Sequence, residues 1–179
     1  RTELHLTRDV RAFFQGNRFL VEALVNEVVS QVDDGPVLDL YAGVGLFGLS
    51  LAAAGWSDVT LVEGDVVSGQ GLVSNASAHG PRARAHRMSV EQFLMTRRSG
   101  ASEETTIIDP PRTGLSRDAL AAVIARGPRR LIYVSCDVAT LARDARGLLE
   151  AGYSLRGLTA FDLFPNTAHV ECVAVFDRR

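Results

Sequence analysis

The sequence predicts an α/β domain, in which a mostly parallel seven-stranded sheet with a reversed last strand carries helices on both faces. Two observations support this prediction. Short apolar stretches suited to buried strands alternate along the chain with longer stretches of helical period, which is the pattern of a parallel sheet with crossover helices. Only a short link joins the last two expected strands, so they should run antiparallel to each other.

Length and composition indicate one domain. The chain has 179 residues, of which 46% are apolar, and this suffices for one substantial core. We expect a single domain over residues 1–179, with residues 1–35 forming a lead-in and a packing helix and residues 36–179 forming a Rossmann-like core. Arg1 stands in place of a starting methionine, so we expect a processed or excised fragment.

Hydropathy, charge and cysteine content argue against several classes of protein. The longest apolar stretches fall far short of a membrane span, and we expect a cytoplasmic monomer without membrane contact. The net charge of -2 argues against a strong phosphate-binding surface. The two cysteines, Cys136 and Cys172, form no C-x-x-C pair, so we expect neither a disulfide scaffold nor a metal or iron–sulfur cluster in this chain.

The first expected helix covers residues 19–32, because its apolar residues recur with helical period on one face that can pack on a core. An irregular lead-in precedes it and contains Gln15. The Gln15 amide either caps or bridges the entry to this helix, or it reaches a ligand.

The segment after this helix carries the strongest cofactor signal. A buried strand that begins at Val37 runs into a loop in which Gly43, Gly45 and Gly48 match the G-x-G-x-x-G spacing, and a helix to Ala54 follows. Such glycines let the backbone approach a nucleotide closely at a helix N-terminus. The next strand ends in Glu63, which is placed to accept hydrogen bonds from ribose hydroxyls.

Asp39 decides between two nucleotide cofactors, because the glycines and the acid alone also fit a nicotinamide dehydrogenase. A carboxylate four residues before the first glycine would face the anionic pyrophosphate of NAD at a cost. The cationic amino and sulfonium groups of S-adenosylmethionine (SAM) would instead favour it. We therefore expect SAM rather than NAD.

The middle of the chain supplies two further candidate contacts. A helix over residues 65–79 and a short third strand lead to a helix over residues 89–96. Ser89 either caps this helix or contacts the adenine of the cofactor. The strand over residues 105–108 ends in Asp109 and two prolines, which stiffen the turn so that the carboxyl group projects into the cleft.

Cys136 follows a helix capped by Ser116 and an apolar strand, Leu131–Val134, and it precedes Asp137, which can cap another helix. The thiol would thus lie at the C-terminal end of a strand, against a helix N-terminus whose partial positive charge favours a thiolate. A buried, inert cysteine is the alternative that a single thiol leaves open.

The last two strands are expected over residues 153–161 and 169–176. Ligands of a parallel sheet bind at the C-terminal ends of its strands, so a reversed final strand would bring its beginning, with Glu171, to the same edge. Glu171 would then share the cleft with Cys136. Cys172 would point to the opposite face by strand alternation and lie in the core.

With these elements in order, the chain resembles the RNA uracil-5-methyltransferase family over nearly its whole length. The motifs that carry the resemblance are Phe13-Phe14-Gln15-Gly16-Asn17, Asp39-Leu40-Tyr41-Ala42-Gly43-Val44-Gly45, Val62-Glu63-Gly64, Asp109-Pro110-Pro111-Arg112, Ser135-Cys136-Asp137 with Leu141-Ala142-Arg143-Asp144, and Phe164-Pro165-Asn166-Thr167-Ala168-His169-Val170-Glu171. Some of these motifs are weak alone, but their order along the chain is highly specific.

The resemblance implies a class I SAM-dependent methyltransferase fold and an enzyme that makes 5-methyluridine in transfer or ribosomal RNA. It implies that Cys136 is a nucleophile that adds to C6 of uracil, and that Glu171 is the base that removes the C5 proton. The target base would be flipped into the cleft, where Asp109 and Arg112 bind it. The residues expected to bind SAM are Gln15, Tyr41, Gly43, Gly45, Glu63, Ser89 and Asp109.

Two positions depart from the pattern of this family. Leu46 stands where the family usually has asparagine, and it cannot hydrogen-bond to the cofactor. Asp137 replaces the asparagine of the usual Ser-Cys-Asn, and its charge beside Cys136 would disfavour the thiolate. The residues alone also leave open methylation of an exocyclic amine, a SAM- or RNA-binding module with little turnover, and, most remotely, a dehydrogenase.

Overall fold

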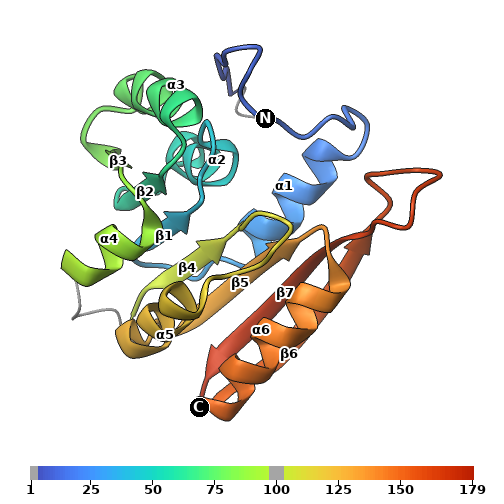
Figure 1. Cartoon of the computed structure of the whole chain (residues 1–179). Helices are drawn as coiled ribbons and strands as arrows, with labels where there is room; N and C mark the ends of the chain where they lie inside the picture. The colour runs from blue at the N-terminus through green and yellow to red at the C-terminus, as the bar shows by residue number, and fades with distance from the viewer. Residues whose placement is uncertain (1–3, 97–102) are drawn as a thin grey trace.

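The computed structural model describes residues 4–96 and 103–179 and shows a central sheet between two layers of helices (Figure 1). The strands are β1 (Val37–Leu40), β2 (Val59–Glu63), β3 (Ala83–Arg87), β4 (Thr105–Ile108), β5 (Arg130–Ser135), β6 (Tyr153–Phe161) and β7 (Glu171–Arg178). The helices are α1 (Val21–Ser30), α2 (Leu46–Ala54), α3 (Val66–Ser77), α4 (Val90–Thr96), α5 (Arg117–Arg126), α6 (Val138–Glu150) and the short 3₁₀ helix η1 (Gly80–Arg82).

The strands form one seven-stranded sheet in the order β3-β2-β1-β4-β5-β7-β6. Neighbouring strands from β3 to β5 are parallel, whereas β7 runs antiparallel to both β5 and β6. The predicted mostly parallel sheet with a reversed last strand is therefore confirmed. The reversed strand lies inside the sheet, because β6 covers its outer side and becomes the edge strand.

Each face of the sheet has its own apolar core, because successive strand residues point to opposite faces. On one face, helices α1, α2 and α3 pack against Ile107 of β4 with side chains such as Leu24 and Leu72. On the other face, helices α4, α5 and α6 pack against the next residue, Ile108, with side chains such as Val123. None of the helices in the described parts of the chain is both long enough and apolar enough to cross a membrane.

Two elements begin later than the sequence pattern indicated, and a local hydrogen bond accounts for each. Helix α1 begins after a turn in which the Asn17 side chain accepts a hydrogen bond from the Phe19 amide at 3.1 Å. Strand β7 begins at Glu171, because the His169 amide donates to Thr167 Oγ1 at 3.2 Å and stays outside the sheet. Both differences lie at element ends, where a periodic pattern defines the boundary least well.

The register of the sheet brings two chemically reactive side chains to one edge. Strands β1, β4 and β5 end at this edge in parallel register. Ser135 of β5 pairs with Cys172 of β7. Because these two strands run in opposite directions, the residue after Ser135, Cys136, lies level with the residue before Cys172, Glu171.

Truncation of a strand leucine should be costly in the core and cheap at the sheet edge. Leu131 of β5 is 0% exposed, whereas Leu158 of β6 is 58% exposed. We expect Leu131→Ala to lower the free energy of unfolding by about 3 kcal/mol, because it leaves a cavity between packed layers. The matched Leu158→Ala should lower it by less than about 1 kcal/mol. Urea unfolding followed by circular dichroism measures both, and equal losses would contradict this packing.

Candidate functional site

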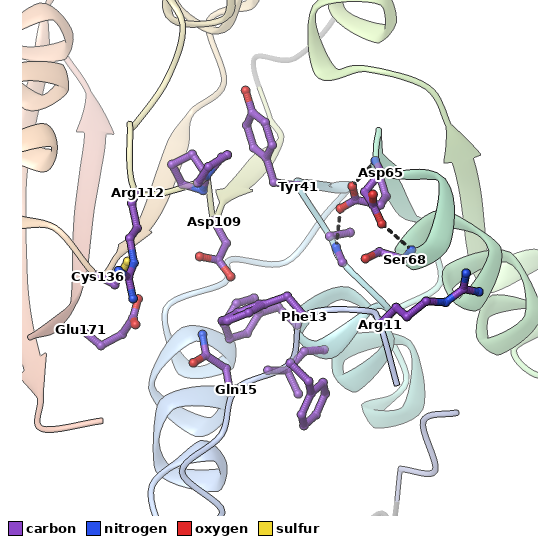
Figure 2. A pocket seen from close by; sticks show the side chains of 18 of the residues that line it. Arg11, Phe13, Gln15, Tyr41, Asp65, Ser68, Asp109, Arg112, Cys136 and Glu171 are labelled. Carbon is purple, nitrogen blue, oxygen red and sulfur yellow. Dashed lines mark hydrogen bonds between the residues drawn. The ribbon is translucent and has the colours of Figure 1, made fainter. Parts of the chain in front are cut away.

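A cavity of about 520 Å³ opens at the C-terminal edge of the parallel strands, between the lead-in, the ends of β1, β2, β4 and β5, and the start of β7 (Figure 2). Its volume lies within the range of sites that bind small molecules. Most of the residues predicted to bind or react line this cavity, namely Gln15, Tyr41, Gly43, Glu63, Asp109, Arg112, Cys136 and Glu171.

Gly45 and Ser89, which were also predicted to bind the cofactor, are not part of the cavity lining. A Cβ on Gly45 would clash with the Leu49 side chain, so this glycine allows close packing beneath the loop. Ser89 caps helix α4, because its Oγ accepts a hydrogen bond from the Gln92 amide at 3.2 Å. Gln92 Oε1 in turn accepts a hydrogen bond from the Ser89 amide at 3.4 Å, which completes a capping box.

The loop after β1 turns its backbone toward the cavity. Tyr41 and Gly43 both have left-handed conformations, with φ values of 60° and 57°. A left-handed backbone is uncommon for a residue with a side chain and often marks a functional site. No described atom lies within 4 Å of the position that a Cβ on Gly43 would occupy, so a ligand can approach the main chain there.

Glu63 is held in place by the backbone of its surroundings. Its Oε2 accepts a hydrogen bond from the Gly43 amide at 2.8 Å, and its Oε1 accepts one from the Asp65 amide at 2.6 Å. Burial raises the pKa of this carboxyl group, and the two backbone hydrogen bonds oppose that rise. The side chain is therefore oriented at the cavity wall, and each oxygen keeps a further lone pair for a ligand hydroxyl.

Asp39, on which the sequence argument for SAM rested, does not line the cavity. It is 0% exposed, and its Oδ2 accepts a hydrogen bond from the Gly48 amide at 2.8 Å. Among the described residues, its Oδ1 has no hydrogen-bond partner. Burial raises the pKa of this group to about 7, so Asp39 can act on a ligand through its charge but not through the direct contact that the sequence suggested.

The lead-in contributes the side chain of Gln15 to the site. Its side chain is 8% exposed, and its buried Oε1 has no hydrogen-bond partner among the described residues. In Figure 2 the amide points from the lead-in toward the carboxyl group of Asp109. A buried amide oxygen without a partner is costly, so this atom is a candidate contact for a bound ligand.

Three ionisable side chains meet at the reactive end of the cavity. Cys136 follows β5, Glu171 begins β7, and Arg112 comes from the loop after β4 (Figure 2). Glu171 is 2% exposed and Cys136 is partly buried, whereas Arg112 is exposed. A thiol, a carboxyl group and a cation thus share a site that is only partly open to water.

The surroundings of Cys136 raise the pKa of its thiol, although the helix N-terminus was expected to favour the thiolate. Burial raises its pKa, and the charges of Glu171 and Asp109 raise it further, while the charge of Arg112 lowers it. The nearby N-terminus of α6 is already capped, because Asp137 Oδ1 accepts a hydrogen bond from the Thr140 amide at 2.8 Å. The charges that act on the thiol therefore come from distant segments of the chain.

The carboxyl groups of the cavity favour a protonated state or a cationic ligand. Burial raises the pKa of Glu171 to about 7. The pKa of Asp109 lies well above its ordinary value, because burial is reinforced by the charges of Glu171, Asp39 and Glu63. A ligand that carries positive charge would lower the cost of ionising these groups. No group of three or more His, Cys, Asp or Glu residues within the described ranges could hold a metal ion.

Several cavity residues had been given no role from the sequence. Phe13 and Phe164 line the cavity from irregular segments, and Arg11 and Asp65 stand at its rim. Phe13 is 72% exposed, which is unusual for a large apolar side chain outside an interaction site. Its only sequence signal was an aromatic pair directly before Gln15, in a segment without helical or strand period.

The fold and the cavity define a Rossmann-like methyltransferase domain, and comparison with known proteins specifies its family. The crystal structure of *Pyrococcus abyssi* tRNA (uracil-54, C5)-methyltransferase in complex with S-adenosyl-L-homocysteine superposes with a TM-score of 0.81 and 32% identity. The match covers 93% of this chain and 40% of that chain. A model of the tRNA (uracil-5-)-methyltransferase family matches residues 87–179, and the chain belongs to this family. The resemblance drawn from the sequence is confirmed.

Curated relatives agree with this assignment. An uncharacterized RNA methyltransferase of Treponema denticola is 32% identical over 92% of this chain and 44% of its own length. The 23S rRNA (uracil(1939)-C(5))-methyltransferase RlmD of Vibrio campbellii is 37% identical over 93% of this chain and 38% of its own length. The chain therefore spans less than half the length of these relatives.

Removal of the Glu171 charge should stabilise the fold at alkaline pH. The pKa of Glu171 in the folded protein, about 7, lies above its ordinary value of 4.5. The cost of ionising the buried carboxyl group is therefore absent below pH 4.5 and complete above about pH 7. We expect Glu171→Gln to raise the free energy of unfolding by on the order of 2–3 kcal/mol near pH 8, and to have little effect near pH 4.5. Urea unfolding at several pH values measures this, and a pH-independent difference would contradict it.

The pKa of the Cys136 thiol should respond to Glu171 more than to Asp137. Because Glu171 contributes a negative charge at the thiol, Glu171→Gln should lower the thiol pKa. Asp137→Asn should change it less, because the Asp137 carboxylate is engaged as a helix cap. The pH dependence of alkylation by iodoacetamide, in a Cys172→Ala background, reports the thiol pKa. A larger shift in Asp137→Asn would show that the charge of Asp137 disfavours the thiolate, as the sequence suggested.

Proposed function

We propose that this domain uses SAM to methylate C5 of a uridine in RNA, through a covalent adduct between Cys136 and C6 of the base. The observation that carries the proposal is the meeting of Cys136, Glu171 and Asp109 at one cavity (Figure 2). The Vibrio and Pyrococcus relatives are named as methyltransferases of uracil C5 in ribosomal and transfer RNA, which supports this substrate. The S-adenosyl-L-homocysteine in the Pyrococcus structure supports the cofactor.

The residues of the cavity fit SAM. Glu63 is oriented to accept hydrogen bonds from ribose hydroxyls, and the Gly43 backbone leaves room for a nucleoside to approach. The unpartnered Oε1 of Gln15 can accept a hydrogen bond from the cationic amino group of SAM. Tyr41 completes the wall. Bound SAM would supply a methyl group made electrophilic by its sulfonium, and the bond from that methyl group to sulfur would break as its bond to C5 of the base forms.

Cys136 makes C5 of uracil reactive. C5 of the free base is too weak a nucleophile to accept a methyl group directly. Addition of the Cys136 thiolate forms a bond from Sγ to C6 and moves the C5–C6 electron pair into an enolate across C5, C4 and O4. The charge of Arg112 beside the thiol favours the thiolate, against the burial that raises its pKa.

Asp109 can stabilise the charge that this addition creates. Its pKa is raised well above the ordinary value, so a protonated carboxyl group is favoured there. A neutral carboxyl group can donate a hydrogen bond to a carbonyl oxygen of uracil, where negative charge develops. The base would have to leave its stack and enter the cavity to receive this contact.

Glu171 completes the reaction. Once C5 carries both its hydrogen and the new methyl group, the Glu171 carboxylate takes the C5 proton. The electron pair of that C–H bond restores the C5–C6 double bond, and the bond from C6 to Sγ breaks to release the Cys136 thiolate. A pKa of about 7 suits this step, because a base is most effective when its pKa lies near the working pH.

Loss of the nucleophile should abolish both turnover and adduct formation. We expect Cys136→Ala to transfer no methyl group to unmodified bulk RNA and to form no adduct with RNA that contains 5-fluorouridine. The matched Cys172→Ala should keep both activities, because Cys172 lies in the core, 5% exposed. Incorporation of radiolabelled methyl groups and a gel-shift assay of the trapped adduct measure these outcomes. Retained transfer by Cys136→Ala would refute the covalent mechanism.

The same assays separate the alternatives that the sequence left open. A methyl group on an exocyclic nitrogen of the product base, located by mass spectrometry of nucleosides, would indicate an amine methyltransferase. Binding of SAM by calorimetry without any transfer would indicate a binding module. Glu171→Gln should form the adduct with ordinary uridine but release it slowly, since the C5 proton then lacks its base.

A further inference from the structure

The loop that follows Asp109 lies against helix α6, and this packing has a role that the reaction steps above do not include. This loop, residues 110–115, is called the Arg112 loop here, because it carries Arg112 to the cavity beside Cys136. Its main chain has few regular partners, since two prolines begin it and no strand continues there. The position of Arg112 therefore depends on contacts from outside the loop.

Three side chains of α6 supply these contacts, namely Thr140, Arg143 and Asp144, which together are called the α6 clamp. Residues three and four apart on a helix share one face, so all three can reach the same loop. The face continues from Asp137, the cap of α6, which directly follows Cys136 in sequence.

Arg143 and Asp144 bind the far half of the Arg112 loop. Arg143 Nη2 donates hydrogen bonds to the carbonyl oxygens of Thr113 and Leu115, both at 3.0 Å. Asp144 Oδ2 accepts a hydrogen bond from the Leu115 amide at 2.8 Å. Charged partners strengthen these bonds compared with bonds between neutral groups.

Thr140 binds the main chain of Arg112, the loop residue that lies beside Cys136. Its Oγ1 lies 3.2 Å from the carbonyl oxygen of Arg112 and 3.1 Å from that of Asp137, so one hydroxyl donor is shared between the loop and the cap of α6. The carbonyl of Arg112 is thereby tied to the first turn of the helix that begins just after Cys136.

The clamp itself is rigid, because its acid is buried and fully engaged. Asp144 is 1% exposed, and its Oδ1 accepts a hydrogen bond from Arg143 Nε at 2.8 Å. Its Oδ2 also accepts a hydrogen bond from the Tyr133 hydroxyl at 2.7 Å. Tyr133 belongs to β5, the strand that leads to Cys136, so the clamp is fixed to the same strand and helix as the thiol.

Gly114 shows how closely the loop is pressed onto the clamp. Its φ of 71° lies in the left-handed region. A Cβ at this position would lie 2.6 Å from both Arg143 Nη2 and Asp144 Oδ2, and 3.1 Å from the Cβ of Thr140. A side chain is therefore excluded, and glycine allows the close approach that the hydrogen bonds require.

We propose that the α6 clamp is a positioning device, which fixes the Arg112 loop so that the Arg112 side chain keeps its place beside the Cys136 thiol. The clamp residues act through the loop and do not touch the reacting atoms. A loop displaced by a small distance would weaken the effect of the Arg112 charge on the thiol and would misplace Asp109, which directly precedes the loop. The inference rests on the proposed function for the identity of the reaction that the loop serves.

The test removes the single hydroxyl that ties Arg112 to α6. In a Cys172→Ala background, Thr140→Val should raise the pH midpoint of Cys136 alkylation by iodoacetamide by roughly half a unit, because Arg112 then lowers the thiol pKa less effectively. The melting temperature should fall by no more than about 4 °C, since one partly exposed hydrogen bond is lost. Thr159→Val is the matched control, because its hydroxyl binds Glu27 Oε1 at 3.0 Å on another part of the sheet. The control should leave the alkylation profile unchanged.

A double mutant separates positioning from a general structural effect. In an Arg112→Gln background, Thr140→Val should cause no further shift of the alkylation profile, because the charge that the clamp positions is already absent. A shift of the same size in both backgrounds would overturn the proposal, as would an unchanged profile in Thr140→Val alone. Tyr133→Phe, which removes the hydroxyl behind Asp144, should shift the profile in the same direction, and an unchanged profile there would also count against the clamp.

Methyl transfer, which needs RNA and SAM, gives a second readout. Thr140→Val should lower kcat several-fold while the Kd for SAM, measured by calorimetry, stays within about twofold, because the clamp acts at the thiol end of the cavity. Alkylation needs neither RNA nor SAM, so the positioning role can be tested even if methyl transfer is not detected. Failure of the proposed function and failure of the clamp are thus distinguishable.

Discussion

Several carboxyl groups lie in or beneath one cavity that is only partly open to water, and the cost of ionising them there governs the rest of the site. Asp39 and Glu63 accept hydrogen bonds from backbone amides of the glycine-rich segment, which offset part of that cost. Burial nevertheless raises the pKa values of all four groups, Asp39, Glu63, Asp109 and Glu171. The backbone amides hold Asp39 and Glu63 in a fixed orientation, while Asp109 and Glu171 stay ready to carry or accept a proton.

Cys136 and Glu171 also constrain each other. The charge of Glu171 raises the pKa of the Cys136 thiol, so the site disfavours a thiolate and a carboxylate at the same time. Under the proposed mechanism, the Cys136 thiolate loses its charge when its sulfur bonds to C6, before the Glu171 carboxylate is needed as a base. The reversal of β7 creates this coupling, because it places the two residues level on adjacent strands.

The sequence predicted the buried strands β1, β2, β4 and β5 well because each is a short stretch rich in apolar residues with a clear end. The short link before β7 was enough to place Glu171 near Cys136. The pKa of the thiol could not be predicted, since the charges around it come from segments far apart in sequence. Ser89 shows that a helix cap and a ligand contact have the same sequence pattern. Phe13 was missed because an aperiodic segment does not indicate which side chains face a cavity, and the buried role of Asp144 depends on a tertiary contact that no spacing indicates.

The position of β7 between β5 and β6 also bears on the order in which the site can assemble during synthesis. A ribosome releases β1 and β2, with Gly43 and Glu63, long before it releases β7. A domain generally folds as a unit. The two halves of the cavity are therefore completed together, and Cys136 meets Glu171 only when the last strand has entered the sheet.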